Sequence, residues 1–526
     1  MFEILEYNFD EDIEDKNDYL DKWPMLYILK NNNQAYIGQS TSIVNRMKQH
    51  KANPEKDIFD KVNTIYSKEF NQSVTFDYES KLIQLFFGDN NFIITNKNNG
   101  LSDCNYFNKE HYDDKFKELW SELREKKLAK HSINQIENSD LFKYSPYKKL
   151  TKDQHKAVNT ILNILMENTY TTINVTGMPG SGKTIAGIFL FKCLRELEEF
   201  KDKKIGFVIP QTSLRKTMKQ IFKNTYNLQA KDIIGPSDVV GKEYDMLIVD
   251  EAHRLHKRKN ITNYKSHDDN NKKLGLGKDG DELDWILHSS GRQILFYDEN
   301  QVIGPSGIDI KSLEGKKDFK DLSFINLSLT SQMRVKGGLD YINFIRSLLQ
   351  GKLTSKKTFT NYEFILFKSF EKFDKKMREK ESECGLSRMV AGYAWQWKSN
   401  KNKNAFDIEI ENINKRWNSK TENWVNLEGA IDEVGCIHSI QGYDLNYAAV
   451  IIGNDLKYDK DNNCIVVDPG SYYDQKGKAT ATIEELTEYI INIYYVLMTR
   501  GIKGTYIYVC DENLREYFAK FVQVQD

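Results

Sequence analysis

The sequence has little proline, no long apolar run and no excess of either charge. Its 526 residues include 8 prolines, and 75 lysines and arginines are balanced by 76 acidic residues, for a net charge of −1. No apolar run approaches the ~20 residues that a membrane helix needs, so we expect no membrane span. The net charge of the chain does not indicate a nucleic-acid partner, so any basic binding surface would have to be local.

Cysteine is also sparse, and the six cysteines are scattered without any C-x-x-C pair. This pattern indicates neither a zinc site nor a disulfide framework, and it fits a reducing cytoplasm. The N-terminal residues MFEILEYNFDEDIED lack the basic start and apolar core of a signal peptide. We therefore expect a cytoplasmic, globular protein, and its length predicts two to four domains.

A phosphate-binding loop is the clearest motif that the chain does contain. Residues 171–184 read TTINVTGMPGSGKT, a β-rich run followed by a glycine turn and then an apolar helical stretch. This is the G-x-x-x-x-G-K-[ST] pattern between a strand and a helix. Its backbone N–H groups and helix N-terminus form an anion site for the phosphates of ATP. Lys183 adds a positive charge, and Thr184 is expected to hold Mg²⁺ or Mn²⁺. The nucleotide-binding residues expected here are Gly177, Pro179, Gly180, Ser181, Gly182, Lys183 and Thr184.

Paired carboxylates follow an apolar run further along the chain. Residues 246–253 read MLIVDEAH, which predicts a buried strand ending at Asp250 and Glu251. Beside a P-loop, the first carboxylate is expected to reach Mg²⁺ and the second to polarise the attacking water.

The motifs between residues 150 and 510 together resemble the helicase domain of the Schlafen type within superfamily 1. The resemblance implies that Gln154 reads adenine and that Gln301 couples nucleotide state to nucleic acid. It also implies that Arg334 and Arg500 act on the charge of the transferred phosphate, and that Gln441 and Gly442 belong to the nucleotide site. Besides the P-loop, the motifs are LTKDQHKAV at 150–158, DEAH at 250–253, DENQ at 298–301, LTSQMR at 329–334, HSIQGYD at 438–444 and YVLMTR at 495–500.

The N-terminal part resembles a GIY-YIG nuclease domain. Two β-rich runs, residues 25–29 and 35–38, are separated by asparagines and predict a hairpin. The second motif is intact as YIG, whereas MLY stands where the family has GIY. The resemblance implies a metal-dependent phosphodiesterase in which a single carboxylate, Glu79, binds the metal. The residues implied as catalytic are Tyr27, Tyr36, Arg46 and Glu79, with His50 and Asn96 as further neighbours.

These features predict an α/β protein. We expect a small α+β GIY-YIG-like nuclease domain followed by two RecA-like P-loop NTPase domains with mainly parallel sheets. We also expect a mobile polar insertion at 256–284.

Candidate base-stacking aromatics are Tyr393, Trp395, Trp397 and Tyr443. The expected divisions are a flexible acidic arm at 1–22, the nuclease domain at 23–108, a helical connector at 109–148, and RecA-like domains at 149–335 and 336–526.

The predicted function is an ATP-dependent nuclease–helicase acting on nucleic acid, DNA in preference to RNA. The fusion suggests defence against foreign DNA. The alternative is a nucleic-acid-gated ATPase whose GIY-YIG-like domain binds without cleaving, which the degenerate MLY motif favours. A small-molecule kinase would not need Gln301, Gln441 or Arg500. The sequence does not indicate the oligomeric state.

Overall fold

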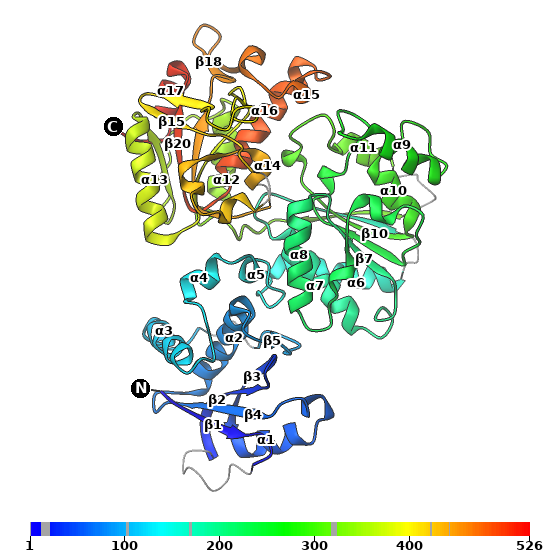
Figure 1. Ribbon diagram of the computed structural model, residues 1–526, viewed down its shortest axis with the longest axis vertical. Coiled ribbons are helices and arrows are strands. Elements are labelled where there is room, and N and C mark those ends of the chain that lie inside the picture. The colour runs from blue at the N-terminus through cyan, green and yellow to red at the C-terminus, as the bar shows by residue number, and fades with distance from the viewer. Residues whose placement is uncertain are drawn as a thin grey trace. The chain divides into compact units, whose positions relative to one another are not determined.

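The computed structural model describes residues 2–11, 21–100, 105–167, 171–316, 323–420, 423–440 and 442–526. The chain divides into two compact units (Figure 1). The first comprises Met1–Leu150, Lys192–Leu197 and Thr217–Ile233, and the second comprises Thr151–Phe191, Glu198–Lys216 and Ile234–Asp526.

The first unit contains a five-stranded sheet in the order β1-β4-β2-β3-β5. β2 and β3 form the predicted hairpin, with Tyr27 opposite Gly38 and Leu29 opposite Tyr36. The turn forms because the side-chain oxygen of Asn31 accepts the backbone N–H groups two and three residues further on, at 2.8 and 2.7 Å. The strands are β1 Glu3–Asn8, β2 Asp21–Lys30, β3 Gln34–Ser42, β4 Lys61–Tyr66 and β5 Ile93–Ile94.

Helices α1 (Ile43–Lys51) and α2 (Gln72–Asp89) lie on opposite faces of this sheet (Figure 1). Successive residues of a strand point to opposite faces. Accordingly, Tyr27 and Leu29 share a core with residues of α1. α2 begins where the Asn71 side chain accepts the backbone N–H of residue 74, at 3.1 Å.

The predicted flexible arm at residues 1–22 is wrong for residues 3–8. They form β1, which pairs with β4 along its whole length. The reason is apolar content that the acidic composition obscured, since Ile4, Tyr7 and Phe9 are all buried. Residues 12–20 of the predicted arm lie outside the described residues.

The charged stretch after the nuclease motifs is helical and packs within the first unit. Helix α3 (Lys109–Glu125) buries Trp120, whose ring centre lies 5.3 Å from that of Phe86 on α2. The Trp120 indole N–H donates to the backbone oxygen of His131 at 3.0 Å. The expected helical connector also contains the short helices α4 (Ile133–Asn138) and α5 (Asp140–Lys143), with Ser139 between them.

The second unit contains two six-stranded sheets, the first in the order β11-β6-β10-β9-β7-β8. β6 pairs in parallel with β10 and β11, and β9 pairs in parallel with β7 and β10. Strands β7 and β9 are buried throughout, as parallel strands covered on both faces are. The strands are β6 Thr171–Gly177, β7 Ile205–Val208, β8 Ile233–Ile234, β9 Met246–Val249, β10 Arg292–Tyr297 and β11 Ser323–Leu329. The helices of this half are α6 Lys152–Glu167, α7 Lys183–Glu196, α8 Thr212–Asn224, α9 Tyr264–Lys273, α10 Glu282–Ser289 and α11 Ile310–Glu314.

The second sheet has the order β16-β13-β17-β20-β12-β21, and neighbouring strands run in parallel. Its central strand β17 serves two cores, because Val450 and Ile452 pack on one face and Ala449 and Ile451 on the other. The strands are β12 Glu363–Phe367, β13 Ser387–Ala391, β16 Val434–Gly435, β17 Leu445–Ile452, β20 Gly501–Val509 and β21 Gln523–Gln525. The helices are α12 Gly338–Leu349, α13 Phe370–Cys384, α14 Ile437–Ile440, α15 Gln475–Lys478, α16 Ile483–Met498 and α17 Glu512–Ala519. Two hairpins accompany this sheet, β14 Ile408–Ile410 with β15 Ile413–Lys415 and β18 Leu456–Asp459 with β19 Cys464–Val467.

The polar segment 256–284, predicted to be a mobile insertion, is instead a packed part of the second unit. Asn271 is buried and accepts the indole N–H of Trp285 at 2.6 Å. Its amide nitrogen donates to the backbone oxygens of Gly277 and Gly280 at 3.0 and 2.9 Å. One buried asparagine therefore closes the glycine-rich turn between α9 and α10.

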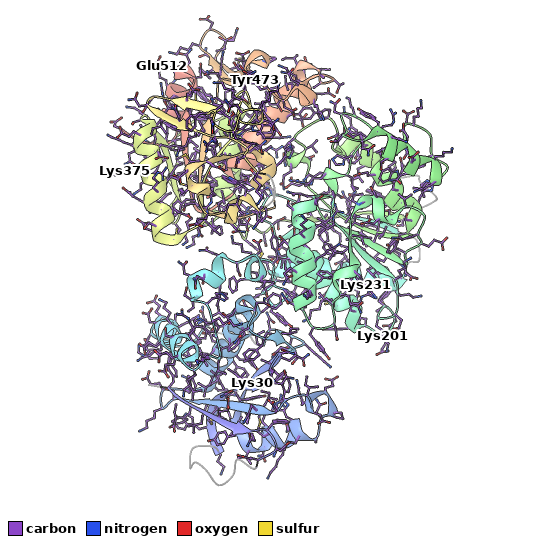
Figure 2. All side chains as sticks on the ribbon, in the orientation of Figure 1. Lys30, Lys201, Lys231, Lys375, Tyr473 and Glu512 are labelled. Carbon is purple, nitrogen blue, oxygen red and sulfur yellow. The ribbon has the colours of Figure 1, made fainter. Side chains whose placement is uncertain are left out.

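The fold class is the predicted one, a small α+β domain and two RecA-like halves with mainly parallel sheets. Charged side chains such as Lys375 on α13 and Glu512 on α17 are exposed (Figure 2). In the described part of the chain, no helix is both long enough and apolar enough to span a membrane.

Candidate functional sites

The P-loop joins β6 to α7 in the second unit. Gly180 and Gly182 have φ angles of +83° and +76°, which only glycine adopts at low cost. A Cβ at Gly180 would also collide with the side chain of Gln332, and one at Gly182 with the side chain of Gln154. These glycines therefore allow both the turn and the close approach of two other segments.

The residues after the third glycine bring an ammonium, a hydroxyl and carboxylates together. Lys183 is buried, and its ammonium donates to the backbone oxygen of Met178 and the carboxylate of Asp298, each at 3.2 Å. The Thr184 hydroxyl donates to one carboxylate oxygen of Asp250 at 2.8 Å, and the other oxygen of Asp250 is buried without a hydrogen-bond partner. Burial, followed by the charge of Glu251, raises the pKa of Asp250. A hydroxyl paired with an unsatisfied carboxylate is a donor set that fits Mg²⁺.

Glu251 adopts a left-handed backbone conformation with a φ of +54°. Its carboxylate lies 2.9 Å from the His253 ring nitrogen Nε2 and 3.7 Å from Nε of Arg254. Burial acts to raise the pKa of Glu251, but the neighbouring His253 and Arg254 charges lower it overall. The carboxylate is therefore held in its ionised form, whose negative charge can orient a water molecule.

A path of polar contacts runs from the P-loop to the second sheet. The Asp298 carboxylate oxygen that contacts Lys183 also accepts the Gln301 side-chain amide at 2.7 Å. The Gln301 side-chain oxygen in turn accepts from Arg500 at 2.9 Å. Arg500 is 1% exposed, and burial, followed by the nearby charge of Arg334, lowers its pKa to about 10. Lys183 and Arg500 are thus joined through two side chains.

The segment that carries Arg334 is docked directly on the P-loop. The backbone N–H of Met333 donates to Gly180 at 2.8 Å, and the Gln332 amide donates to Pro179 at 2.6 Å. The Arg334 guanidinium forms an ion pair with Asp444, which follows the β16–α14 region of the second sheet.

Gln154 is fully buried, and its side-chain amide is bonded within the protein. The amide nitrogen donates to the backbone oxygen of Ser181 at 2.7 Å, and the oxygen accepts the backbone N–H of Thr151 at 2.9 Å. In this conformation the amide holds the P-loop, and reading adenine would require it to exchange these bonds.

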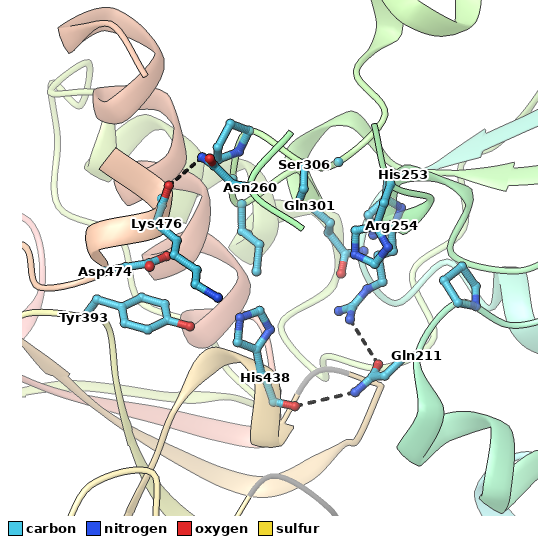
Figure 3. A pocket seen from close by; sticks show the side chains of 17 residues that line it. Gln211, His253, Arg254, Asn260, Gln301, Ser306, Tyr393, His438, Asp474 and Lys476 are labelled. Atoms are coloured by element: carbon cyan, nitrogen blue, oxygen red, sulfur yellow. Dashed lines mark hydrogen bonds between the residues drawn. The ribbon is translucent and has the colours of Figure 1, made fainter. Parts of the chain in front are cut away.

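A hollow of about 450 Å³ lies beside this path, lined by residues from both halves of the second unit (Figure 3). Arg254 donates to the Gln211 side chain at 3.1 Å, and the Gln211 amide lies 3.5 Å from the backbone oxygen of His438. The His438 side chain is exposed and lines the hollow. Gln301 also lines the hollow, which therefore adjoins the path from Lys183 to Arg500.

The nuclease motifs converge in the first unit. The Tyr27 hydroxyl lies 2.8 Å from Nε2 of His50 and accepts from Nε of Arg46 at 3.1 Å. The Tyr36 ring stands edge-on to that of His50, with centres 5.4 Å apart. Gly38 is required here, because a Cβ would overlap the Tyr27 ring. The two strands, α1 and the intact YIG motif therefore assemble one cluster.

The charges of this cluster are set mainly by burial. Burial raises the pKa of both tyrosines, and the Arg46 charge opposes it. Burial, followed by the Arg46 charge, lowers the pKa of His50 to about 4, so the ring is a neutral acceptor at pH 7. Burial raises the pKa of Glu79 to about 7, against a backbone hydrogen bond from Gln39 and the Arg46 charge.

Glu79 is the carboxylate expected to bind a metal ion in this cluster. Within the described ranges, no group of three or more His, Cys, Asp or Glu residues is arranged to hold a metal ion. Glu79 alone fits a Mg²⁺ ion that keeps most of its water, as Mg²⁺ prefers.

Two family models match this chain. The model described as Schlafen group 3, DNA/RNA helicase domain, matches residues 171–511. The chain belongs to this Schlafen group 3 helicase family. The model of the GIY-YIG catalytic domain matches residues 24–88, in front of the Schlafen helicase domain.

One curated protein and three solved structures are similar to parts of this Schlafen-family chain. The uncharacterized protein YPL245W of Saccharomyces cerevisiae is 32% identical over 231 residues, covering 42% of this chain and 49% of the relative. The chain thus spans about half the length of that relative. An arterivirus nonstructural protein 10 helicase with DNA has a TM-score of 0.27 at 13% identity, covering 68% of this chain and 65% of that one. Mss116p bound to ssRNA and AMP-PNP has a TM-score of 0.34 at 13% identity, with 70% and 74% covered. The helicase MrfA bound to DNA has a TM-score of 0.31 at 9% identity, with 72% and 52% covered.

In this Schlafen-family chain, the structure brings most of the expected site residues together in two groups. The motor group, from Gln154 to Arg500, lies along the P-loop and the path to the second sheet. Gly442 has a φ of +88°, and a Cβ there would lie 3.5 Å from Leu214. Gln441 lies outside the described residues. The nuclease group joins Tyr27, Tyr36, Arg46 and His50, and its remaining expected members are Glu79 and Asn96.

Other expectations receive a different local explanation. Asn96 accepts the backbone N–H of Ile37 at 3.0 Å and donates to its oxygen at 2.7 Å, so it extends the sheet beside β3. Of the four aromatics expected to stack bases, Tyr443 is a core residue at 3% exposure, and Trp395 is partly buried against a core of the second sheet. Tyr393 lines the hollow in Figure 3, and Trp397 is 37% exposed.

The sequence did not predict that Asp298 links Lys183 to Gln301 or that Arg254 lines the hollow. It also did not predict the role of Asp153. The Asp153 carboxylate accepts the backbone N–H groups of Thr330 and Ser331 at 2.9 and 2.8 Å. Asp298 and Arg254 lie within or directly after the quoted motifs, and Asp153 precedes Gln154, so proximity to the motifs was the available signal.

Proposed function

We propose that this chain is an ATP-dependent nuclease–helicase. Its motor hydrolyses ATP to move along or unwind nucleic acid, DNA in preference to RNA, and its GIY-YIG domain cleaves phosphodiester bonds with a divalent metal. The path from Lys183 through Asp298 and Gln301 to Arg500 carries the motor proposal. Through such a path, a change at the phosphate site can be transmitted to the second sheet. A motor requires this coupling.

In the motor, Thr184 and Asp250 would hold Mg²⁺, which when bound neutralises charge on the β- and γ-phosphates. The P-loop N–H groups and Lys183 bind the phosphates of ATP. Glu251 orients the attacking water and accepts its proton, consistent with its ionised state. Arg334 and Arg500 stabilise the charge that develops as the γ-phosphate leaves.

The hollow in Figure 3 supports a nucleic-acid partner for this motor. Arg254 and Lys476 bring positive charge to its wall, and Tyr393 brings an aromatic ring. Gln301 faces both the hollow and the Asp298 carboxylate. A nucleic acid bound here would act on Gln301 and so on the phosphate site.

In the nuclease domain, Glu79 would hold the divalent metal, which when bound polarises the scissile phosphate. Arg46 neutralises charge that develops on the phosphate. Tyr27 and Tyr36 position the attacking water, and the neutral His50 holds the Tyr27 hydroxyl in place through the contact at Nε2. The proposed setting is a cytoplasmic protein that defends against foreign DNA.

A second candidate function is favoured by one local feature. The Tyr27 hydroxyl is buried and already bonded to both His50 and Arg46, and Met25 stands in place of the motif glycine. A domain locked in this way would bind nucleic acid without cutting it, and the chain would be a nucleic-acid-gated ATPase. Metal-dependent nicking by the full chain, compared with Glu79→Ala, separates the two functions.

The test of the motor is the rate of ATP hydrolysis with single-stranded DNA, duplex DNA and RNA added separately. We expect stimulation by nucleic acid, largest with DNA. A rate that no nucleic acid changes would contradict the motor proposal. Stimulation by RNA alone would keep the motor and reverse the preference for DNA.

A further inference from the structure

Lys56 is a buried cation that neither the motifs nor the proposed mechanism uses. It ends the short helix Pro54–Lys56 and is 8% exposed. Its ammonium nitrogen lies 3.4 Å from the centre of the Tyr36 ring and 5.7 Å from that of Phe59. Among the residues that the structure describes, no carboxylate forms an ion pair with it; the adjacent Glu55 pairs with Lys97 at 3.2 Å.

Folding stability does not explain this lysine. Burying an ammonium group without a carboxylate partner costs free energy. Burial lowers the pKa of Lys56 to about 8, opposed by Glu55 and reinforced by Lys97 and Arg46. The cation–π contact with Tyr36 offsets only part of such a cost. A methionine would fill the same space without the free-energy cost of burying a charge.

The surroundings of the ammonium point to an anion. Lys56 lines one hollow together with Tyr36, Arg46, His50 and Asn96. The hollow is also lined by Lys97 and Glu55, which pair with each other at 3.2 Å. Lys56 and Arg46 are the remaining cations of the lining, and His50 is neutral at pH 7. The hollow therefore carries a net positive charge and an aromatic face, which suits a phosphate of a nucleic-acid backbone.

We propose that Lys56 is a substrate-binding residue of the nuclease site, whose ammonium binds a backbone phosphate of the nucleic acid beside Arg46 while resting on the ring of Tyr36. The identity of the anion rests on the proposed nuclease function. The bound phosphate would supply the partner that Lys56 lacks among the described residues, and the ammonium would also hold the Tyr36 ring in position.

The test is the salt dependence of binding. The full chain carrying Glu79→Ala, without divalent metal, is titrated with a labelled DNA duplex at several salt concentrations, with and without Lys56→Met. Losing one phosphate contact should reduce the slope of log affinity against log salt by about 0.9 and weaken binding roughly tenfold near 0.1 M salt. Lys56→Arg should restore most of the slope.

Two further measurements distinguish substrate binding from a structural role. Lys30→Met is the matched control, because Lys30 is partly buried in the same domain but pairs with Glu6 at 3.1 Å; its slope should equal that of the parent. Melting temperature should stay constant or rise in Lys56→Met, whereas a structural lysine would lower it. Equal slopes for Lys56→Met and the parent, or a lowered melting temperature with an unchanged slope, would overturn the assignment.

Failure of the nuclease function gives a different result. If the wild-type chain does not cut DNA with metal but Lys56→Met still reduces the slope, the cleavage proposal fails and the phosphate contact stands. If the wild-type chain cuts DNA and the slopes are equal, the phosphate contact alone fails.

Discussion

At the scale of single residues, we predict that Glu251 and Lys183 act on ATP in different ways. Lys183→Ala should weaken ATP binding, because it removes a charge from the phosphate site. Glu251→Gln should still bind ATP but hydrolyse it at least about a hundredfold more slowly, because it no longer accepts a proton. Nucleotide affinity and turnover are measured separately, with the exposed Glu243→Gln as the matched control. Wild-type turnover in both variants would show that this P-loop is not the hydrolytic site.

His50 provides a prediction about pH at the same scale. Its pKa is about 4 in the folded chain, below the ordinary value of 6.5, because of burial and then the charges of Arg46 and Lys56. Between these values the unfolded chain binds a proton that the folded chain does not, so stability falls as pH drops from 6.5 towards 4. His50→Gln should remove about 1–3 kcal/mol of this pH dependence, a range discounted for partial solvation. Melting curves at pH 7 and pH 5 measure it, and identical pH dependence in the two proteins would refute it.

At the scale of elements, Asp153 connects the start of α6 to the segment that docks on the P-loop. Its carboxylate accepts two backbone N–H groups, from Thr330 and Ser331. Asp153→Ala should destabilise the second unit by about 1–3 kcal/mol and slow ATP turnover, because Arg334 loses its support. Asp153→Asn keeps an acceptor oxygen and should be milder. Thermal unfolding and turnover are measured together, and normal turnover in a destabilised Asp153→Ala chain would disconnect this segment from catalysis.

Also at the scale of elements, the patterns that the sequence predicted well are local ones. The two β-rich runs and the asparagines between them predicted the hairpin of β2 and β3, and the P-loop motif predicted a strand before a helix. The acidic start of the chain was predicted as an arm because its charges outnumber Ile4, Tyr7 and Phe9, whose burial depends on pairing with β4, far along the sequence. The segment 256–284 was likewise predicted to be mobile from its polar composition. The hydrogen bonds of the buried Asn271 that order it form only in the folded protein, so the local sequence does not reveal them.

The same distinction applies to the sites. Motifs identified the P-loop, the DEAH carboxylates and the nuclease tyrosines by number, because their chemistry lies in neighbouring residues. The path through Asp298 joins positions 183, 298, 301 and 500, and only the fold brings these together. Lys56 carries no motif at all, and its position on the Tyr36 ring follows from packing.

At the scale of the whole molecule, the path predicts energetic coupling between the two sheets of the motor. Gln301→Ala removes the side chain that links Asp298 to Arg500, and Arg500→Lys keeps the charge but loses the shape that reaches Gln301. Each change should slow ATP turnover by roughly 10²–10³-fold with little effect on ATP affinity, because an arginine at transferring phosphate acts on the transition state. The double variant should lose less than the product of the two effects. Fully multiplicative losses would show that the two side chains act independently.

The most direct test of the whole account is the rate at which the full chain cuts one long DNA duplex, with metal and with or without ATP. We predict that wild type cuts the duplex and that ATP accelerates cutting. Glu79→Ala should not cut at all while retaining ATP turnover, and Lys183→Ala should cut at the ATP-free rate. Equal cutting by wild type and Glu79→Ala would contradict the nuclease assignment, and equal cutting by wild type and Lys183→Ala in ATP would contradict the coupling of motor and nuclease.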